Sequence, residues 1–145
     1  MSYRERLRTV LRVDEGEFLT AYPDPLTKGD PWTIGVGHTG PEVVKGLVIS
    51  QVRSDAYLEG DIDEAEADAR KLIPGFDALV DARKVVIVSM AFNLGYARLS
   101  KFVGTLRAVN ACKWEEAANG MQSSLWAKQV GRRADRLADM MRKGV

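Results

Sequence analysis

The stretch Thr33-Ile34-Gly35-Val36-Gly37-His38 decides the fold class, because it alternates with period two in a chain that elsewhere follows helical spacing. Proline and glycine residues between positions 23 and 31 break any helix before it. We therefore predict a small antiparallel hairpin over residues 18–38. Strand alternation places Thr33, Gly35 and Gly37 on one face and Ile34, Val36 and His38 on the other. One face of this hairpin is predicted to be almost bare backbone.

An amphipathic helix is predicted over residues 3–15, immediately before the hairpin. Apolar residues at helical spacing form one side and arginines the other; these are Tyr3, Leu7, Val10 and Leu11 against Arg4, Arg8 and Arg12. Gly16 is a helix stop signal, so Glu15 is expected in the last turn. Because Glu15 shares the i+4 row of Leu7 and Leu11, its carboxylate is predicted to point inward.

The rest of the chain predicts helices. Ser50 is a plausible N-cap for a long exposed helix over residues 52–72. A mostly apolar helix is expected at 77–94, stopped by Gly95, followed by shorter helices at 100–111, 114–121 and 131–143. The fold class is therefore α+β, mainly α. We expect one domain, 1–145, with a β-rich lobe near 15–50, a linking helix near 51–72, and a helical lobe near 73–145 on which helix 2–14 packs.

Composition and charge exclude several classes of protein. With 145 residues, 46% of them hydrophobic and 28% charged, the chain can form one globular core and is too apolar for a disordered protein. A net charge of +1 argues against a nucleic-acid coat protein. Cys112 is the only cysteine and His38 the only histidine, so we expect no disulfide, no metal site and no cofactor. The charged N-terminus, and the lack of an apolar run of about 20 residues, predict a cytoplasmic chain with neither signal peptide nor membrane insertion.

Three polar side chains are expected to converge near the end of the first helix. Glu15 closes that helix, Asp24 lies in the proline-rich loop, and Thr33 begins the next strand. The negative end of the helix and burial both favour a protonated Glu15 over a protonated Asp24. Two carboxyl groups in unequal environments suit a general acid and its partner base, and the bare glycine face would admit a sugar ring. Because a Glu-Gly pair often follows a helix, a solvated surface carboxylate is an equal alternative for Glu15 on spacing alone.

The motifs Asp14-Glu15-Gly16, Ala21-Tyr22-Pro23-Asp24 and Thr33-Ile34-Gly35-Val36-Gly37-His38-Thr39-Gly40 together resemble the N-terminal motif of the T4-type phage lysozymes. The resemblance continues through residues 88–95, 102–107, 114–118 and 132–136, and so covers nearly the whole chain. It implies a lysozyme-like fold and an endolysin that cuts bacterial peptidoglycan. The implied activity is that of an N-acetylmuramidase, which hydrolyses the β-1,4 bond between N-acetylmuramic acid and N-acetylglucosamine.

Carried over by position, the resemblance implies Glu15 as the catalytic acid, Asp24 as the second carboxylate and Thr33 as the hydroxyl that helps to hold the attacking water. Glu15 would protonate the glycosidic oxygen while this water attacks the opposite face of the sugar with inversion. The loop between Asp24 and Thr33 is longer than in the family pattern, so Asp30 inside it is the alternative second carboxylate. Arg133 matches a basic residue that pairs with the catalytic glutamate.

Further roles are also implied by the resemblance. His38 matches a histidine that pairs with an acid, and Asp61 falls at the corresponding place. Substrate-binding positions of the family match Thr39, Phe92, Asn93 and Thr105. For Phe92 a core position is an equal alternative, because an aromatic residue at helical spacing usually packs in a core. Trp114 and Trp126 are expected to be core anchors.

Other functions are weighed against this one. A lytic transglycosylase uses the acid alone and closes an anhydro ring without water, which the presence of Asp24 and Thr33 argues against. A non-catalytic glycan-binding homologue is disfavoured because all three polar residues are present. A nucleic-acid module on the basic segment 128–143 is disfavoured by the near-neutral charge. A solvated helix face is the favoured interpretation of that segment, and attraction to an anionic cell wall is the alternative. The expected partners are peptidoglycan and, indirectly, a holin that lets a monomeric enzyme reach the wall from the host cytoplasm.

Overall fold

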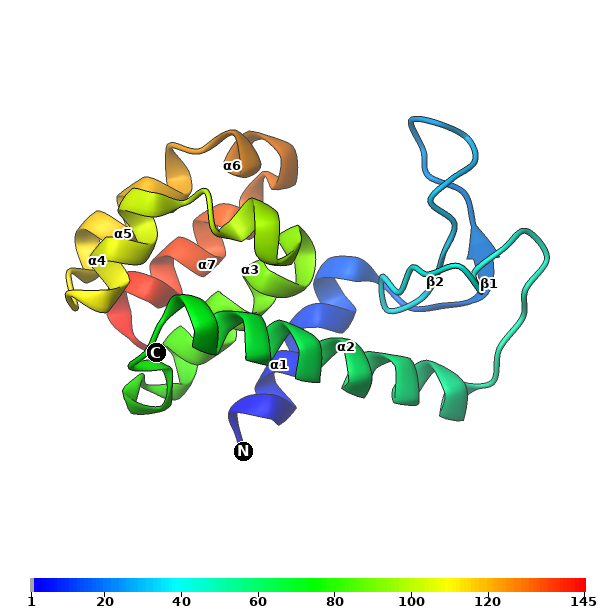
Figure 1. Ribbon diagram of the computed structural model, residues 1–145, viewed down its shortest axis with the longest axis horizontal. Coiled ribbons are helices and arrows are strands. Elements are labelled where there is room, and N and C mark those ends of the chain that lie inside the picture. Colours follow the sequence, from blue (N-terminus) through cyan, green and yellow to red (C-terminus); the bar gives the residue numbers. More distant parts are fainter. Residues whose placement is uncertain (1) are drawn as a thin grey trace. The chain divides into compact units, whose positions relative to one another are not determined.

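The computed structural model describes residues 2–145, and Figure 1 shows its helices and strands. It is 64% helical with one two-stranded antiparallel sheet, which confirms the predicted α+β, mainly α class. The chain divides into two compact units: the sheet unit, Arg8–Asp63, and the helical unit, Glu64–Val145 with the residues up to Leu7. This division falls inside the helices α1 (Tyr3–Glu15) and α2 (Gln51–Leu72), whereas the lobe boundaries expected from the sequence lie at helix ends.

Two short strands form the sheet of the sheet unit. They are β1 (Phe18–Tyr22) and β2 (Thr33–Gly35), which pair antiparallel with Phe18 opposite Gly35 and Tyr22 opposite Thr33. Residues 47–49 form backbone hydrogen bonds with β1 as well. The hairpin predicted between residues 18 and 38 is therefore present, and its loop runs from residue 23 to residue 32.

The prediction that alternation continues to His38 is wrong. The strand β2 ends at Gly35, and the chain turns back so that Ile34 and His38 exchange two backbone hydrogen bonds of 2.9 Å. The turn is possible because Gly35 and Gly37 adopt φ angles of +61° and +66°, which side chains other than glycine rarely allow. The glycines predicted to leave a face bare instead let the backbone reverse.

The predicted end of α1 and start of α2 are both confirmed within a residue. The helix α1 ends at Glu15 and is followed by Gly16 with a φ of +72°, while its inward residues Leu7 and Leu11 are fully buried. Ser50 is the N-cap expected for α2, because its Oγ accepts a hydrogen bond of 3.1 Å from the amide of Arg53.

Short helices follow α3 in the helical unit, which forms the left part of Figure 1. Its elements are a 3-10 turn η1 (Phe76–Ala78) and the helices α3 (Asp81–Leu99), α4 (Val103–Asn110), α5 (Trp114–Gln122), α6 (Leu125–Val130) and α7 (Arg132–Lys143). The stop predicted at Gly95 is a kink with φ 76° and ψ 166°, after which the chain resumes a helical course to Leu99. The short helix α6 is missing from the sequence prediction. None of the helices among residues 2–145 has the length and apolar character required to span a membrane.

The core of the helical unit centres on α3, whose residues 85–88 are entirely buried. Arg83, at 9% exposure, donates hydrogen bonds to the carbonyl oxygens of Met141 (2.7 Å) and Arg142 (2.9 Å), and so holds the last turn of α7. Its guanidinium also lies 3.9 Å from the ring centre of Trp114. Trp126 is buried, as expected for a core anchor, whereas Trp114 is half-buried beneath Arg83.

Candidate active site

The carboxylate of Glu15 lies directly against the backbone of Gly37. A Cβ atom added to Gly37 would be 3.2 Å from Glu15 Oε2 and 3.4 Å from Glu15 Cγ. Glu15 itself is half-buried at the end of α1. The helix end and the glycine turn therefore place a carboxyl group beside backbone rather than beside a side chain.

Tyr22 interacts with both Glu15 and Thr33, although no role for Tyr22 was predicted from the sequence. It is the direct cross-strand partner of Thr33, and the two hydroxyl groups share a hydrogen bond. Burial raises the pKa of the Tyr22 phenol, and the negative charge of Glu15 raises it further, while the hydrogen bond to Thr33 acts in the opposite direction. Glu15, Tyr22 and Thr33 thus form one interacting cluster. The strand register was the missing signal, because only the register shows that Tyr22 faces Thr33.

Asp24 lies two residues beyond Tyr22 and therefore at the same end of the hairpin as Thr33. Its Oδ1 atom accepts hydrogen bonds from the amides of Leu26 (2.8 Å) and Thr27 (3.0 Å). The alternative carboxylate, Asp30, lies in the same loop and is exposed, whereas Asp24 is half-buried. Of the two, Asp24 has the fixed carboxylate.

His38 is held by two carboxylates and a ring. Its Nδ1 lies 2.7 Å from Asp61, the partner expected from the sequence, and its Nε2 lies 2.8 Å from Glu42, while its ring stacks on Tyr57 at 3.9 Å. Burial acts to lower the pKa of His38, but the hydrogen bonds and charges of Glu42 and Asp61 outweigh it and raise the pKa above its usual value. Burial raises the pKa of Asp61, and the hydrogen bond from His38 lowers that of Glu42. With both ring nitrogens occupied, His38 ties the glycine turn to α2.

The other candidates are spread over both units. Thr39 is exposed in the sheet unit, whereas Phe92, Asn93, Thr105 and Arg133 belong to the helical unit. Asn93 accepts a hydrogen bond of 2.8 Å from the indole nitrogen of Trp126, so part of its side chain already serves the packing of α6. Thr105 is buried, and its hydroxyl occupies the space that a side chain at Gly120 would need. Phe92 is half-buried. The substrate contacts of these residues, and the pairing of Arg133 with Glu15, stay predictions.

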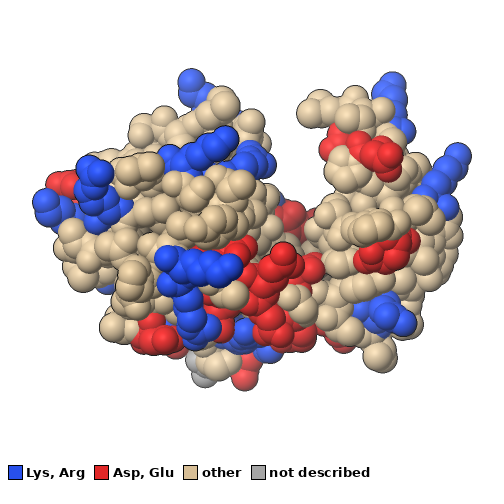
Figure 2. Space-filling model, in the orientation of Figure 1, with Lys and Arg blue, Asp and Glu red and all other residues tan. Residues whose placement is uncertain are grey.

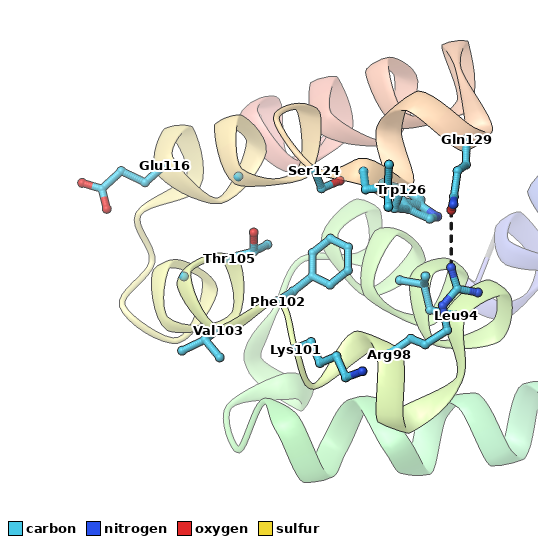
Figure 3. A pocket seen from close by; sticks show the side chains of 13 residues that line it. Leu94, Arg98, Lys101, Phe102, Val103, Thr105, Glu116, Ser124, Trp126 and Gln129 are labelled. Atoms are coloured by element: carbon cyan, nitrogen blue, oxygen red, sulfur yellow. Dashed lines mark hydrogen bonds between the residues drawn. The ribbon is translucent and has the colours of Figure 1, made fainter.

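The helical unit also contains a pocket of about 670 Å³, shown in Figure 3. Its apolar wall consists of Leu94, Phe102, Val103, Leu125 and Trp126. Thr105 lies in the same lining, and Arg98 and Lys101 stand along one side of it. Arg98 donates a hydrogen bond of 3.4 Å to Gln129, which also lines the pocket. The pocket thus combines an apolar wall with two cations and the carboxylate of Glu116.

Acidic side chains gather in the lower middle of the face in Figure 2, whereas the basic side chains are more scattered. Figure 2 shows Lys and Arg side chains over the helical unit, separated from one another by neutral surface. Part of the predicted basic segment 128–143 is neutralised, because Arg142 pairs with Glu115 and Lys143 with Asp139. Among residues 2–145, no group of three or more His, Cys, Asp or Glu side chains is arranged to hold a metal ion.

Comparison with known proteins identifies the family. The model of the family described as phage lysozyme matches residues 13–143. Two relatives from Dictyostelium discoideum, probable T4-type lysozymes 2 and 1, are 26% and 28% identical over alignments of 163 residues that cover 95% of this chain and 94% of each relative. The pre-baseplate central spike protein Gp5 of Enterobacteria phage T4 is 29% identical over 159 residues, covering 93% of this chain and 27% of that protein. This chain belongs to the phage lysozyme family and is a lysozyme-type glycoside hydrolase.

Proposed function

We propose that this lysozyme is an N-acetylmuramidase endolysin that hydrolyses the β-1,4 bond between N-acetylmuramic acid and N-acetylglucosamine. The observation that carries the proposal is the cluster of Glu15, Tyr22 and Thr33 beside the backbone of Gly37. The absence of a side chain at Gly37 leaves room for the Glu15 carboxylate, and Tyr22 and Thr33 supply hydroxyl groups in the same cluster. Asp24 at the same end of the hairpin supplies the second carboxylate of a glycosidase.

The proposed reaction is a single displacement with inversion. Glu15 gives its proton to the glycosidic oxygen as the bond from this oxygen to the anomeric carbon breaks. A water molecule held by Asp24 and Thr33 forms the new bond from the opposite face and releases a proton to Asp24. Proton exchange with solvent then restores a protonated Glu15 and an ionised Asp24.

The same substrate accounts for the pocket of the helical unit. Peptidoglycan carries short peptides with free carboxylate groups, and an anionic, partly apolar peptide matches a pocket with an apolar wall and the cations of Arg98 and Lys101. We therefore assign this pocket to the peptide part of the polymer. Phe92, Asn93 and Thr39 are assigned to the glycan strand, and Thr105, which lines the pocket, to the sugar that carries the peptide.

Host lysis is the proposed biological role. The enzyme, as a monomer in the host cytoplasm, reaches the wall after a holin has permeabilised the membrane. Expression of this chain with and without a holin tests that role, because prompt lysis is expected only when both are made. Lysis at the same rate without a holin would contradict it.

The experiment that tests the activity is loss of turbidity in outer-membrane-permeabilised Gram-negative cells, with wild type and Glu15→Gln side by side. We expect lysis by the wild type and a rate lower by about 1,000-fold or more for the variant, since the acid provides a large share of the rate. Substantial lysis by Glu15→Gln would remove Glu15 from the acid role.

Mass spectrometry of the digested wall separates the proposal from its alternatives. Hydrolysis leaves muramic acid at a reducing end, whereas a lytic transglycosylase leaves an anhydro ring. A folded wild-type protein that binds the wall and releases neither product would instead be a non-catalytic glycan-binding homologue.

A further inference from the structure

The loop that carries Asp24 is closed by its own hydrogen bonds. The amide of Asp24 donates to the carbonyl oxygen of Gly29 (3.0 Å), and the amide of Lys28 donates to the carbonyl oxygen of Asp24 (2.8 Å). These bonds join the two ends of the loop while its tip stays in solvent, where Leu26 is 93% exposed. A loop with so little buried side-chain surface depends on such polar contacts for a fixed shape.

Thr27 lies at the centre of these contacts. Its hydroxyl donates to the carbonyl oxygen of Asp30 (2.6 Å) and accepts from the amide of Gly29 (3.3 Å). Its own amide donates to Asp24 Oδ1 (3.0 Å). Thr27 therefore links the two parts of the loop: its hydroxyl binds the backbone at the far end, and its amide binds the Asp24 carboxylate.

The consequence is an asymmetric carboxylate. Asp24 Oδ1 already accepts two amide hydrogen bonds, from Leu26 and Thr27. Asp24 Oδ2 accepts none from residues 2–145. Two bonds to one oxygen fix the rotation of the carboxylate, and the other oxygen is left to accept a hydrogen bond from water.

We infer that Thr27 is a positioning residue for the reaction: its hydroxyl fixes the loop so that the amides of Leu26 and Thr27 hold one oxygen of Asp24 and leave the other for the attacking water. The inference rests on the proposed function, because it requires that Asp24 orients this water. Displacement of a reacting group by about 1 Å can reduce a rate about 100-fold, so a loosened loop is expected to slow the chemical step more than it weakens substrate binding.

The test compares Thr27→Val, which removes the hydroxyl with little change of shape, with Thr27→Ser, which retains it. For Thr27→Val we expect kcat on purified peptidoglycan to fall about 10- to 100-fold, with KM within about 2-fold of the wild-type value. Thr27→Ser is expected to restore most of kcat.

The matched control is Thr20→Val, the same chemical change at an exposed position on β1, which is expected to leave kcat unchanged. The inference is overturned if Thr27→Val retains kcat within about 2-fold, or if Thr27→Ser is as impaired as Thr27→Val. Glu15→Gln and Asp24→Asn are measured alongside, so that failure of the Thr27 inference can be distinguished from failure of the proposed function. If both are inactive and Thr27→Val is fully active, only this inference fails; if Glu15→Gln is active, the proposed function fails.

Discussion

Glu15 Oε2 lies 3.2 Å from the point that a Cβ atom on Gly37 would occupy. Gly37 also has a φ of +66°, so it allows the turn after β2 and, because it has no side chain, also leaves room for the carboxylate. The acid and the glycine are 22 positions apart in the sequence, and the hairpin brings them into contact.

Gly37→Ala is therefore expected to impair catalysis by displacing Glu15. The added methyl group pushes against the carboxylate, and we expect kcat on peptidoglycan to fall about 10- to 100-fold. The positive φ also costs about 1 kcal/mol of stability in any alanine variant. Gly46→Ala is the control, since Gly46 has a φ of +89° but no atom within 4 Å of its added Cβ. If the two variants lose the same fraction of kcat, backbone strain and not the contact with Glu15 is the cause.

Tyr22→Phe removes the hydroxyl that bonds to Thr33 and keeps the ring. We expect a fall in kcat of about 10-fold with little change in KM, because Thr33 loses the partner that orients it. Tyr96→Phe, at an exposed position in α3, is the matched control. Wild-type kcat in Tyr22→Phe would show that Thr33 is oriented without Tyr22.

Asp24→Asn and Asp30→Asn decide which carboxylate of the loop acts. The structure favours Asp24, which is half-buried with one oxygen fixed, over the exposed Asp30. We expect Asp24→Asn to reduce the initial rate of turbidity loss at least about 100-fold and Asp30→Asn to keep at least about half of it. The opposite order would assign the second carboxylate to Asp30.

Much of the fold could be predicted from local signals. Gly16 and the apolar row of α1 place Glu15 at a helix end, and Ser50 marks the start of α2. The turn after β2 could not be predicted in this way, because two glycines permit both an extended strand and a reversal. The short helix α6 escaped prediction because its six residues span less than two turns and show no clear periodicity.

The candidate site likewise contains residues that local sequence predicts and residues that only the folded structure reveals. Glu15, Asp24 and Thr33 are visible in the sequence as residue types at a recognisable spacing. The roles of Tyr22 and Thr27 depend on the strand register and on backbone hydrogen bonds within the loop, neither of which a residue type specifies. Asn93 shows the converse, since a residue expected to bind substrate also bonds to Trp126 across a contact between α3 and α6.

The His38 cluster predicts a pH dependence of stability. Because Glu42 and Asp61 raise the pKa of His38, the protonated ring is favoured in the folded state, and this stabilisation is fully present below the unfolded pKa of about 6.5 and is lost as the pH rises through the folded value. The pKa of Glu42 is lowered, so the stabilisation that Glu42 contributes to the folded state is present above a pH of about 4.5 and is lost as the pH falls. We expect His38→Gln to lower the Tm by about 3 °C between those two pH values and by less at pH 9. A Tm difference that does not change between pH 5.5 and 9 would contradict the prediction.

Arg98→Ala and Lys101→Ala test the assignment of the helical pocket to the peptide of peptidoglycan. Loss of either cation is expected to raise KM on intact peptidoglycan about 5-fold, with kcat nearly unchanged, because a charge-assisted hydrogen bond to a carboxylate is lost from binding. The effect is expected to shrink as salt is added and to be absent on glycan strands from which an amidase has removed the peptides. Lys113→Ala, an exposed cation outside the pocket lining, is the control. An equal rise in KM on peptide-free strands would move the two cations from the peptide to the glycan.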